Sequence, residues 1–348
     1  MKIAIDAQLT VGTATGIGEY VRGLMRALRD RGTDEIIELS EPMLDPWRFD
    51  RRVFWDQVLL PQRTRQCAPD LLHCASGTVP MALAVPFVVT VHDVAWLRVQ
   101  SHTRPYARYY FGRFSIDRYR HAAVIAVDSA FSRAELLDVM PELDPERVRV
   151  VYPGVAADYC SLQREGGDGR TILVVGTVER RKNLLAIIEA LPSLPDARVI
   201  AVGPSTPYKD ECEERARELR VAHRVDFRGY VAREDLLELY ASAAAIAMPS
   251  TYEGFGYAAA QGLCAGVPVV VSDAASLPEI VAGEGRIVPL ADTAGWIEAL
   301  ASALRGDEEA RAAAIRPRAI DRFAWPKSAN DMHAAYELAR TLTPMHSP

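Results

Sequence analysis

The stretch from residue 249 to residue 268 reads PSTYEGFGYAAAQGLCAGVP, and it places a glycine-containing loop between an apolar strand and an alanine-rich helix. Gly266 ends this helix before the next strand. Such a loop exposes backbone N–H groups at a helix start, where the helix dipole favours an anion such as a diphosphate. Glu253, at the edge of the loop, could accept hydrogen bonds from sugar hydroxyl groups. The two glycines alone favour the simpler interpretation, a tight turn beside a solvated carboxylate.

A second informative stretch runs from residue 174 to residue 190 and reads VVGTVERRKNLLAIIEA. A strand ends at Gly176, and three consecutive cations, Arg180–Lys182, precede a helix. Cations at the start of a helix oppose its dipole, so a purely structural role would be mildly unfavourable. A solvated basic loop remains the alternative for any single arginine.

Around these two stretches, short β-branched runs alternate with helical patterns almost from end to end. This alternation is typical of βαβ units and parallel sheets. The expected strands are Lys2–Asp6, Leu71–Cys74, Phe87–His92, Val124–Asp128, Val148–Tyr152, Thr171–Gly176, Arg198–Gly203, Val225–Arg228, Ala245–Pro249 and Pro268–Ser272. The expected helices include Gly18–Arg31, Ala130–Met140, Asn183–Leu191, Glu234–Ala244 and Lys327–Leu342.

The chain of 348 residues is long enough for two domains. Tyr152–Arg170 interrupts the strand–helix rhythm with one proline and four glycines, which indicates an inter-domain linker. Two doubly wound halves joined there would leave a cleft that faces the carboxyl ends of both sheets, where ligands usually bind.

Composition narrows the class of protein. A formal net charge of -6 argues against a general nucleic-acid binder. The first residues, MKIAIDAQLT, lack the pattern of a signal peptide, and no apolar run approaches the length of a membrane span. We therefore expect a cytoplasmic protein. Its thiols are expected to be buried or incidental ones in a reducing compartment, because the five cysteines are scattered without metal-ligand spacing. They are Cys67, Cys74, Cys160, Cys212 and Cys264.

A nicotinamide-dependent dehydrogenase, the obvious alternative for a doubly wound fold, lacks its main motif here. The first strand runs into Ala7-Gln8-Leu9. Val175-Gly176-Thr177 is not followed by the remaining glycines of GxGxxG. The sequence therefore disfavours this function.

Residues 249–268 resemble the E-x7-E signature of glycosyltransferase family four, including the flanking P-S-x-x-E-G-F-G and A-G-V-P-V-V. This family has the GT-B fold. The resemblance implies that Glu253 contacts the donor sugar and that the amides after it approach the diphosphate. Gln261 stands where the family has a second glutamate that holds the ribose. The amides expected near the diphosphate are those of Gly254, Phe255 and Gly256.

The second stretch resembles the family's G-T-x-x-x-R-K-N motif, which begins here at Gly176 and Thr177. The resemblance implies that Arg181 and Lys182 bind the donor phosphates. These cations would stabilise the charge that develops on the departing phosphate, so no metal ion or other cofactor is expected.

Further similarities lie in the first half of the chain. His92 and Asp93 follow a buried strand, as a His-Asp pair does in the family, which implies that His92 lies beside the reacting sugar. Such a pair is also often structural. Residues 15–21, TGIGEYV, resemble the family's N-terminal glycine loop, which implies that Gly16 and Gly18 face the diphosphate and the acceptor. Residues 51–61 and 128–136 are less specific landmarks.

One basic and aromatic segment, Arg104–His121, suggests a partner. Tyr106, Tyr110 and Phe114 are spaced i, i+4, i+8 and would share one face of a helix. A basic aromatic helix can lie on an anionic membrane surface, which here would be the inner face of the cytoplasmic membrane. The alternative is an aromatic stripe packed on the domain core, with the arginines in solvent.

The resemblance implies a GT-B fold, α/β in class, built from two Rossmann-like domains with parallel sheets. We expect an N-terminal acceptor domain over residues 1–155, a donor domain over residues 156–324, and a last helix at residues 325–345 that crosses back to the first domain. The implied reaction is a retaining, metal-independent transfer by front-face substitution. Its substrates are a nucleotide sugar and a saccharide or lipid-linked acceptor, without nucleic acid.

The full set of motifs is most similar to bacterial mannosyltransferases of surface-polysaccharide biosynthesis, which implies GDP-mannose as the donor. Two alternatives stay open. A UDP-sugar is compatible with the same motifs, because no identified residue contacts the base. A different class of function, a non-catalytic sugar- or nucleotide-binding module, is suggested by the departure at Gln261. The intact Glu253, Arg181 and Lys182 favour an enzyme.

Overall fold

A computed structural model describes residues 1–12, 16–99 and 105–342. The chain divides into two compact units. The N-terminal unit comprises Met1–Gly154 and the described residues from Ala324 onward, and the C-terminal unit comprises Val155–Phe323. The chain crosses between them twice, each time one residue before the expected boundary.

The N-terminal unit is built on a six-stranded parallel sheet with the order β2-β1-β3-β4-β5-β6. Strand β1 pairs with β2 on one side and β3 on the other, so Ile3 lies between Ile36 and Leu71. The apolar run FVVTV of β4 is buried throughout, as expected for a parallel strand covered on both faces. The strands are β1 (Lys2–Asp6), β2 (Glu35–Leu39), β3 (Leu71–Cys74), β4 (Phe87–Val91), β5 (Val124–Val127) and β6 (Val148–Val150).

The last helix, α16 (Trp325–Leu342), packs against α1 (Gly16–Arg31) in this unit. Two glycines make room for Trp325: an added Cβ would lie 2.1 Å from its ring at Gly23 and 2.3 Å from it at Gly154. No helix within the described ranges is long and apolar enough to cross a membrane. The other helices are α2 (Phe49–Phe54), α3 (Leu60–Cys67), α4 (Ala95–Arg98), α5 (Pro105–Arg108), α6 (Ser115–Arg118) and α7 (Ala130–Val139).

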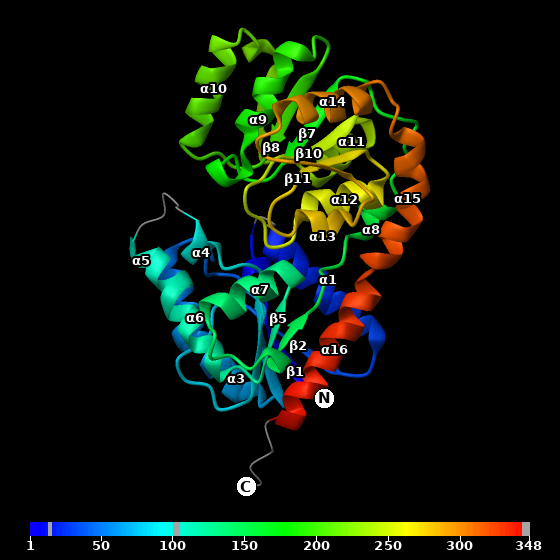
Figure 1. The fold of residues 1–348 in the computed structure, drawn as a ribbon. Helices are drawn as coiled ribbons and strands as arrows, with labels where there is room; N and C mark the ends of the chain where they lie inside the picture. Colours follow the sequence, from blue (N-terminus) through cyan, green and yellow to red (C-terminus); the bar gives the residue numbers. More distant parts are fainter. Residues whose placement is uncertain (13–15, 100–104, 343–348) are drawn as a thin grey trace. The chain divides into compact units, whose positions relative to one another are not determined.

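The C-terminal unit has a second six-stranded parallel sheet, with the order β12-β11-β10-β7-β8-β9 (Figure 1). The chain runs outward from β7 to β9, returns to β10 beside β7, and then runs outward in the other direction. This is the Rossmann order, and its reversal lies between β7 and β10. The strands are β7 (Thr171–Val175), β8 (Arg198–Val202), β9 (Val225–Gly229), β10 (Ala245–Met248), β11 (Val269–Ser272) and β12 (Arg286–Val288).

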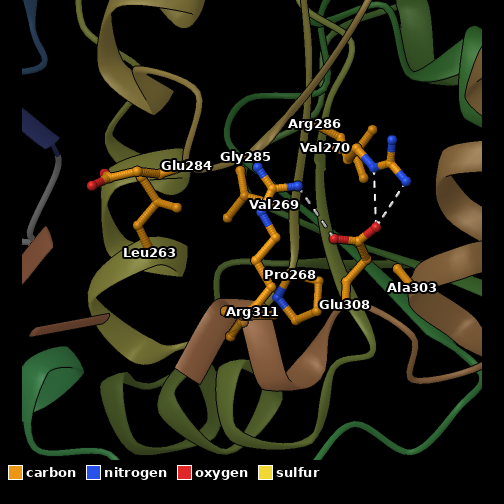
Figure 2. Close-up of a pocket in the computed structure, with 12 residues that line it drawn as sticks. Leu263, Pro268, Val269, Val270, Glu284, Gly285, Arg286, Ala303, Glu308 and Arg311 are labelled. Atoms are coloured by element: carbon orange, nitrogen blue, oxygen red, sulfur yellow. Dashed lines mark hydrogen bonds and ion pairs between the residues drawn. The ribbon is translucent and has the colours of Figure 1, made fainter. Parts of the chain in front are cut away.

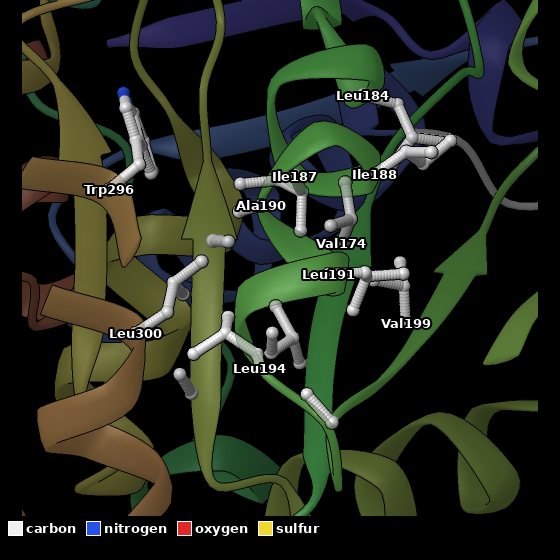
Figure 3. Close-up of a cluster of buried hydrophobic side chains, with 14 of the residues drawn as sticks. Val174, Leu184, Ile187, Ile188, Ala190, Leu191, Leu194, Val199, Trp296 and Leu300 are labelled. Atoms are coloured by element: carbon white, nitrogen blue, oxygen red, sulfur yellow. The ribbon is translucent and has the colours of Figure 1, made fainter. Parts of the chain in front are cut away.

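Helices cover both faces of this sheet. On one face, α9 and α14 bury Ile187, Leu300 and Trp296 against the strands (Figure 3). On the other face, α12 approaches so closely that an added Cβ at Gly262 would lie 2.8 Å from Val269. The helices are α8 (Ala157–Cys160), α9 (Leu184–Ala190), α10 (Tyr208–Glu218), α11 (Arg233–Ser242), α12 (Tyr257–Ala265), α13 (Leu277–Val281), α14 (Thr293–Leu304) and α15 (Glu309–Arg322).

The expected α/β class with two parallel sheets is confirmed, and all ten expected strands are present. Two further strands, β2 and β12, were not expected from the sequence. Both lie at a sheet edge, so fewer of their residues are buried: β2 contains two glutamates, and two of the three residues of β12 are exposed. An edge strand therefore carries a weaker apolar signal than a central one.

The expected linker, Tyr152–Arg170, is mostly packed structure rather than a free connection. From Val155 onward it belongs to the C-terminal unit and contains α8, whose Tyr159 is fully buried. At Gly167 an added Cβ would lie 2.6 Å from the Cα of Ala244. The glycines here therefore allow close backbone packing, which their number alone does not distinguish from a linker.

The helix expected over Arg104–His121 is present as one continuous helical run from Pro105 to His121, with a π-helical segment and a final 3₁₀ turn inside it. Arg104 lies outside the described residues, and a π-helical segment, Tyr109–Phe114, separates α5 from α6. Tyr106 and Tyr110 both contact the ring of Phe49, at ring distances of 4.6 and 5.7 Å. Tyr110 is buried and stacks on Phe114 at a ring distance of 5.4 Å, whereas Tyr106 is exposed.

We expect Gly203→Ala to destabilise the C-terminal unit strongly. Gly203 has φ +139°, and an added Cβ would lie 2.2 Å from the carbonyl oxygen of Gly176. Backbone displacement and strain together should cost about 3 kcal/mol or more, measured by urea unfolding.

Gly229→Ala is the matched control. Its φ is +62°, and an added Cβ there would meet no atom of the described residues within 4 Å. The control should cost only about 1 kcal/mol, the strain of the left-handed backbone. Equal losses in the two variants would contradict the steric argument.

Candidate functional site

The candidate site lies at the carboxyl ends of β7 and β10, where the strand order of the C-terminal unit reverses. The two loops that leave these strands must diverge, and such a point is the usual ligand site of an open α/β sheet. The loop after β7 carries Arg181 and Lys182, and the loop after β10 carries Glu253. The backbone N–H of Thr251 donates to the carbonyl oxygen of Arg181 at 2.7 Å, which ties the two loops together.

The start of the β7 loop depends on glycine. Gly176 has φ +136°, and an added Cβ would lie 3.3 Å from Cε of Lys182. The lysine stem therefore lies directly over this glycine. Arg180–Lys182 form a single 3₁₀ turn, and Asn183 follows in the left-handed conformation with φ 52° before α9 begins. Gly176 thus gives Lys182 the space to reach Glu253.

Glu253 is the centre of the site, with only 5% of its surface exposed. Its Oε1 accepts hydrogen bonds from Nζ of Lys182 and, at 2.8 Å, from Oγ of Ser250. Its Oε2 lies 3.3 Å from Nη1 of Arg181, which also donates to the carbonyl oxygen of Tyr252 at 3.1 Å. The expected cations Arg181 and Lys182 therefore both contact the expected carboxylate of Glu253.

The cluster keeps Glu253 ionised. Burial alone would raise the pKa of its carboxyl, but the charges of Lys182 and Arg181 and the hydrogen bonds from Lys182 and Ser250 outweigh burial. The pKa of Glu253 is therefore lowered below 4.5. A second carboxylate, Glu179, lies 2.8 Å from Nε of Arg181. An anionic ligand would have to compete with these carboxylates for the cations.

The loop after Glu253 is held by a buried serine. Oγ of Ser276 donates to the carbonyl oxygens of Glu253 and Phe255 at 3.0 and 2.9 Å. Gly256, the residue immediately before α12, has φ +97°, and an added Cβ there would lie 2.7 Å from Leu277. The expected amides, from Gly254 to Gly256, thus lie where a nine-residue helix begins, and its dipole favours an anion.

Gln261, expected at the ribose, lies one turn further along α12. Its Oε1 accepts a hydrogen bond from the hydroxyl of Tyr240 at 3.0 Å. Tyr240 is fully buried, and burial raises the pKa of its phenol well above its usual value, so the hydroxyl stays protonated. The contact orients the Gln261 amide with its oxygen toward Tyr240, which leaves the NH₂ group as the end available to a ligand.

The remaining expected residues belong to the N-terminal unit. His92 follows β4, and its Nδ1 lies 2.7 Å from Asp128 and its Nε2 3.1 Å from the carbonyl oxygen of Ala75. Burial lowers the pKa of His92, but Asp128 and the hydrogen bonds raise it more, so its pKa lies above the usual value. Both partners are acceptors, which fits two ring N–H donors.

The expected glycine loop leads into α1 in this same unit. Gly16 is exposed and begins the helix, and Gly18 is buried. Thr15 lies outside the described residues. The ring of Tyr20, also in α1, meets the ring of His92 edge to face at 5.0 Å. The N-terminal glycines and His92 therefore lie on adjoining elements of one unit.

The landmark at residues 51–61 forms a buried charge cluster at the carboxyl ends of β1 and β3. Nε of Arg52 lies 3.0 Å from Asp56, and its Nη2 lies 3.5 Å from Asp6. Nε1 of Trp55 donates to Asp6 at 2.9 Å. Burial raises the pKa of Asp56 to about 6, although Arg52 opposes the shift. The motif thus has a structural role that its sequence did not indicate.

A pocket lies at the opposite, amino end of the second sheet, between β11, β12 and α15 (Figure 2). Three of its charged side chains pair with one another, since Glu308 lies 2.9 Å from Arg286 and 3.6 Å from Arg311, and the fourth, Glu284, lies 3.2 Å from Arg322. Among the described residues, no group of three His, Cys, Asp or Glu side chains is arranged to hold a metal ion. The charged cluster around Glu253 therefore remains the candidate site.

Sequence reasoning missed several residues that shape the site. Ser250 and Ser276 fix the carboxylate and the loop, and Glu179 pairs with Arg181. Tyr240 orients Gln261. Ser276 and Tyr240 lie some twenty residues from their partners, so no local pattern could have found them, whereas Ser250 and Glu179 belong to the quoted motifs.

Two models of known protein families match this chain. Residues 14–159 match the model of Glycosyltransferase Family 4, and residues 163–319 match the model of Glycosyl transferases group 1. Both models describe glycosyltransferases, so this chain is similar to glycosyltransferases over both of its halves. The second match contains Arg181, Lys182, Glu253 and Gln261.

Individual relatives agree with this assignment. D-inositol 3-phosphate glycosyltransferase of Mycobacteroides abscessus is 29% identical over 274 residues, which cover 72% of this chain. The match spans 60% of that relative's length. Sucrose-phosphate synthase of Thermosynechococcus elongatus has a similar structure, with a TM-score of 0.71, 20% identity, and coverage of 99% of this chain and 100% of that one.

HepE of Anabaena, solved in complex with UDP and glucose, gives a TM-score of 0.71 at 17% identity, with 97% and 99% of the two chains covered. At these identities the two solved structures support the GT-B fold. The expected GT-B architecture is therefore confirmed.

The lowered pKa of Glu253 predicts a pH dependence of stability. Because this pKa is lower in the folded protein than in the unfolded chain, ionised Glu253 stabilises the fold above pH 4.5. The contribution is lost as the pH falls through the folded-state pKa. Glu253→Gln should therefore lose unfolding free energy less steeply than the wild type below pH 4.5, in urea titrations at stepped pH.

The exposed Glu238 provides the control, and Glu238→Gln should keep the slope of the wild type. Parallel curves for Glu253→Gln and the wild type would show that Lys182 and Arg181 do not stabilise the ionised carboxylate.

Proposed function

We propose that the protein is a retaining, metal-independent glycosyltransferase that transfers a sugar from a nucleotide diphosphate to a saccharide or lipid-linked acceptor. One observation carries this proposal. Arg181 and Lys182, both partly exposed, and the buried Glu253 form a single charge cluster beside the start of α12, at the reversal of strand order. This arrangement offers cations to a diphosphate and a carboxylate to sugar hydroxyls.

The chemistry assigned to the cations is charge stabilisation. When the bond between the sugar C1 and the diphosphate oxygen breaks, negative charge develops on the departing phosphate. Fixed cations beside that position stabilise the transition state more than the ground state. Lys182 and Arg181 are already held by Glu253, so little reorganisation is needed before reaction.

The bond-forming step places the acceptor oxygen on the face of the sugar that the diphosphate leaves. A new bond forms between the acceptor oxygen and C1, and the acceptor proton passes to the leaving phosphate. Glu253 is paired with two cations rather than with a second carboxylate. A retaining glycosidase instead needs two carboxyl groups about 5 Å apart, one of them a nucleophile. We therefore propose that Glu253 binds the donor sugar without forming a covalent intermediate.

We propose GDP-mannose as the donor, from the similarity of the motifs to bacterial mannosyltransferases. A UDP-sugar is the second candidate, favoured by the complex of HepE with UDP and glucose. The name of the Mycobacteroides relative adds D-inositol 3-phosphate to the acceptors that should be assayed. Product analysis with each donor would decide between the candidates.

Lys182→Ala should lower kcat by about 10²-fold, because it removes a donor aimed at the developing charge. Lys209→Ala, on the exposed side of α10, is the control and should leave kcat unchanged. Both rates are measured as release of the nucleoside diphosphate.

EDTA should leave the wild-type rate unchanged. A rate that collapses in EDTA would contradict metal-free catalysis. Absence of both transfer and donor hydrolysis with every nucleotide sugar would favour the non-catalytic binding module.

Gln261→Ala should raise KM for the donor several-fold and leave kcat nearly unchanged. The proposed ribose contact is the same in the ground and transition states, so its loss weakens binding uniformly. Tyr240→Phe should shift KM in the same direction but less, because Gln261 keeps its amide and loses only its orienting partner. An unchanged KM in Gln261→Ala would show that this residue does not hold the ribose.

We also propose that the N-terminal unit touches the inner face of the cytoplasmic membrane through an anionic lipid surface. Several exposed apolar side chains lie on neighbouring segments: the ring of exposed Tyr106 lies 4.6 Å from Phe49 of α2, and α2 ends at exposed Phe54. Arg108 and Arg113 are exposed on the same segment as Tyr106 and Tyr109. The cationic side chains can pair with anionic lipid headgroups, and the apolar side chains can enter the boundary between the headgroups and the acyl chains.

Changing both Arg108 and Arg113 to Gln should weaken binding to vesicles of phosphatidylglycerol and phosphatidylcholine by about 30-fold. Each basic residue near such a surface contributes about 1 kcal/mol. Changing Arg228 and Arg305 to Gln, both exposed in the C-terminal unit, is the matched control and should bind as the wild type does. Equal cosedimentation of all three proteins, or none, would favour a purely structural aromatic segment.

A further inference from the structure

Two cysteines that are 104 positions apart meet inside the C-terminal unit. Cys160 ends α8, Cys264 lies in α12, and the two helices pack against each other. The two side chains are close enough for each thiol to shift the pKa of the other. Neither the sequence motifs nor the proposed reaction accounts for this pair.

A single arginine holds the backbone of both cysteines. Nε of Arg316, in α15, donates to the carbonyl oxygen of Cys264 at 3.1 Å, and its Nη2 donates to that of Cys160 at 2.8 Å. The guanidinium also donates to the carbonyl oxygen of Leu162 at 2.7 Å. One planar guanidinium therefore holds the backbone at both cysteines, which limits how far the two thiols can move apart.

The two thiols differ in reactivity. Cys160 is half-buried, whereas Cys264 is fully buried. The hydrogen bond from Cys264 lowers the pKa of the Cys160 thiol, burial opposes this shift, and Arg316 adds to it. The same hydrogen bond, together with burial, raises the pKa of Cys264. Cys160 is thus the more accessible thiol of the pair, and Cys264 is its buried neighbour, as in cysteine pairs that sense oxidants.

We propose that Cys160 and Cys264 form an oxidation site for hydroperoxides, at which the thiol pair is converted into a disulfide. The Cys160 thiolate attacks the peroxide, an S–O bond forms, the O–O bond breaks, and hydroxide leaves and takes up a proton. Cys264 then attacks the sulfenic acid, an S–S bond forms, and the oxygen leaves as water. Two thiols supply the two electrons that reduce one hydrogen peroxide to two waters.

The disulfide would change the helix that begins at the candidate site. A disulfide fixes the two sulfurs about 2.05 Å apart, so it would join α8 and α12 covalently and limit their movement relative to each other. Helix α12 begins at Tyr257 and carries Gln261, whereas α8 begins two residues after the chain enters this unit at Val155. Resting on the proposed function, we infer that oxidation weakens donor binding several-fold.

The chemical test does not depend on activity. The reduced wild-type protein is treated with a small excess of hydrogen peroxide, alkylated under denaturing conditions, and analysed by intact mass and peptide mapping. Cys160 and Cys264 should lose both alkylation sites and appear in one cross-linked peptide pair that dithiothreitol releases. Cys67→Ser, a half-buried cysteine of the N-terminal unit, is the control and should form the same cross-link.

Two variants separate the roles of the thiols. Cys264→Ser should accumulate sulfenic acid at Cys160, trapped by dimedone, and Cys160→Ser should leave Cys264 alkylatable after peroxide. Irreversible sulfinic acid at wild-type Cys160 with a free Cys264, or no oxidation of either thiol, would overturn the proposed site.

The regulatory consequence has its own readout. The dissociation constant of the nucleotide sugar is compared for reduced, oxidised and re-reduced protein, with Cys160→Ser as the insensitive control. A several-fold weakening that dithiothreitol reverses is expected. A formed cross-link with unchanged affinity would overturn the effect on the donor, and a protein that binds no nucleotide sugar but forms the cross-link would contradict only the proposed function.

Discussion

The buried carboxylate of Glu253 is the constraint on which the candidate site depends. An ionised carboxylate with 5% exposure is costly unless cations and hydrogen bonds compensate for its lost hydration. Lys182 and Arg181, about seventy positions earlier, supply the cations, so the loops after β7 and β10 must stay in contact. The glycine at 176 leaves room for the lysine stem, and Ser276 fixes the loop that follows. The site is therefore assembled before any ligand binds.

A similar device occurs in the N-terminal unit. Arg52 is buried between Asp6 and Asp56 at the carboxyl ends of β1 and β3, again where the strand order reverses. At such a point the loops that follow the two adjacent strands leave in opposite directions, and no ladder of backbone hydrogen bonds connects these loops. A buried ion pair can supply that connection with specific geometry, although its net contribution to stability is small. Both units thus use buried charge to fix the same position of a doubly wound sheet.

Much of the fold could be predicted from the sequence, because central parallel strands are continuous apolar runs with helical patterns between them. The edge strands β2 and β12 could not, since their exposed residues weaken that pattern. At the site, local motifs predicted Arg181, Lys182 and Glu253. The contacts with Ser276 and Tyr240 and between the two cysteines join residues distant in sequence, and no single-sequence pattern encodes such pairs. The π-helical turn at Tyr109–Phe114 likewise depends on tertiary packing rather than on spacing.

The measurement that tests the central claim most directly is thermal unfolding of the wild type and of Arg181→Ala in the presence of GDP-, UDP- and dTDP-sugars. A ligand that binds only the folded protein stabilises it by about 2.7 kcal/mol at a hundred times its Kd. The account predicts that one class of nucleotide sugar raises the Tm of the wild type and that Arg181→Ala loses most of this shift. An equal shift in both proteins, or no shift with any nucleotide sugar, would contradict a donor site built on Arg181, Lys182 and Glu253.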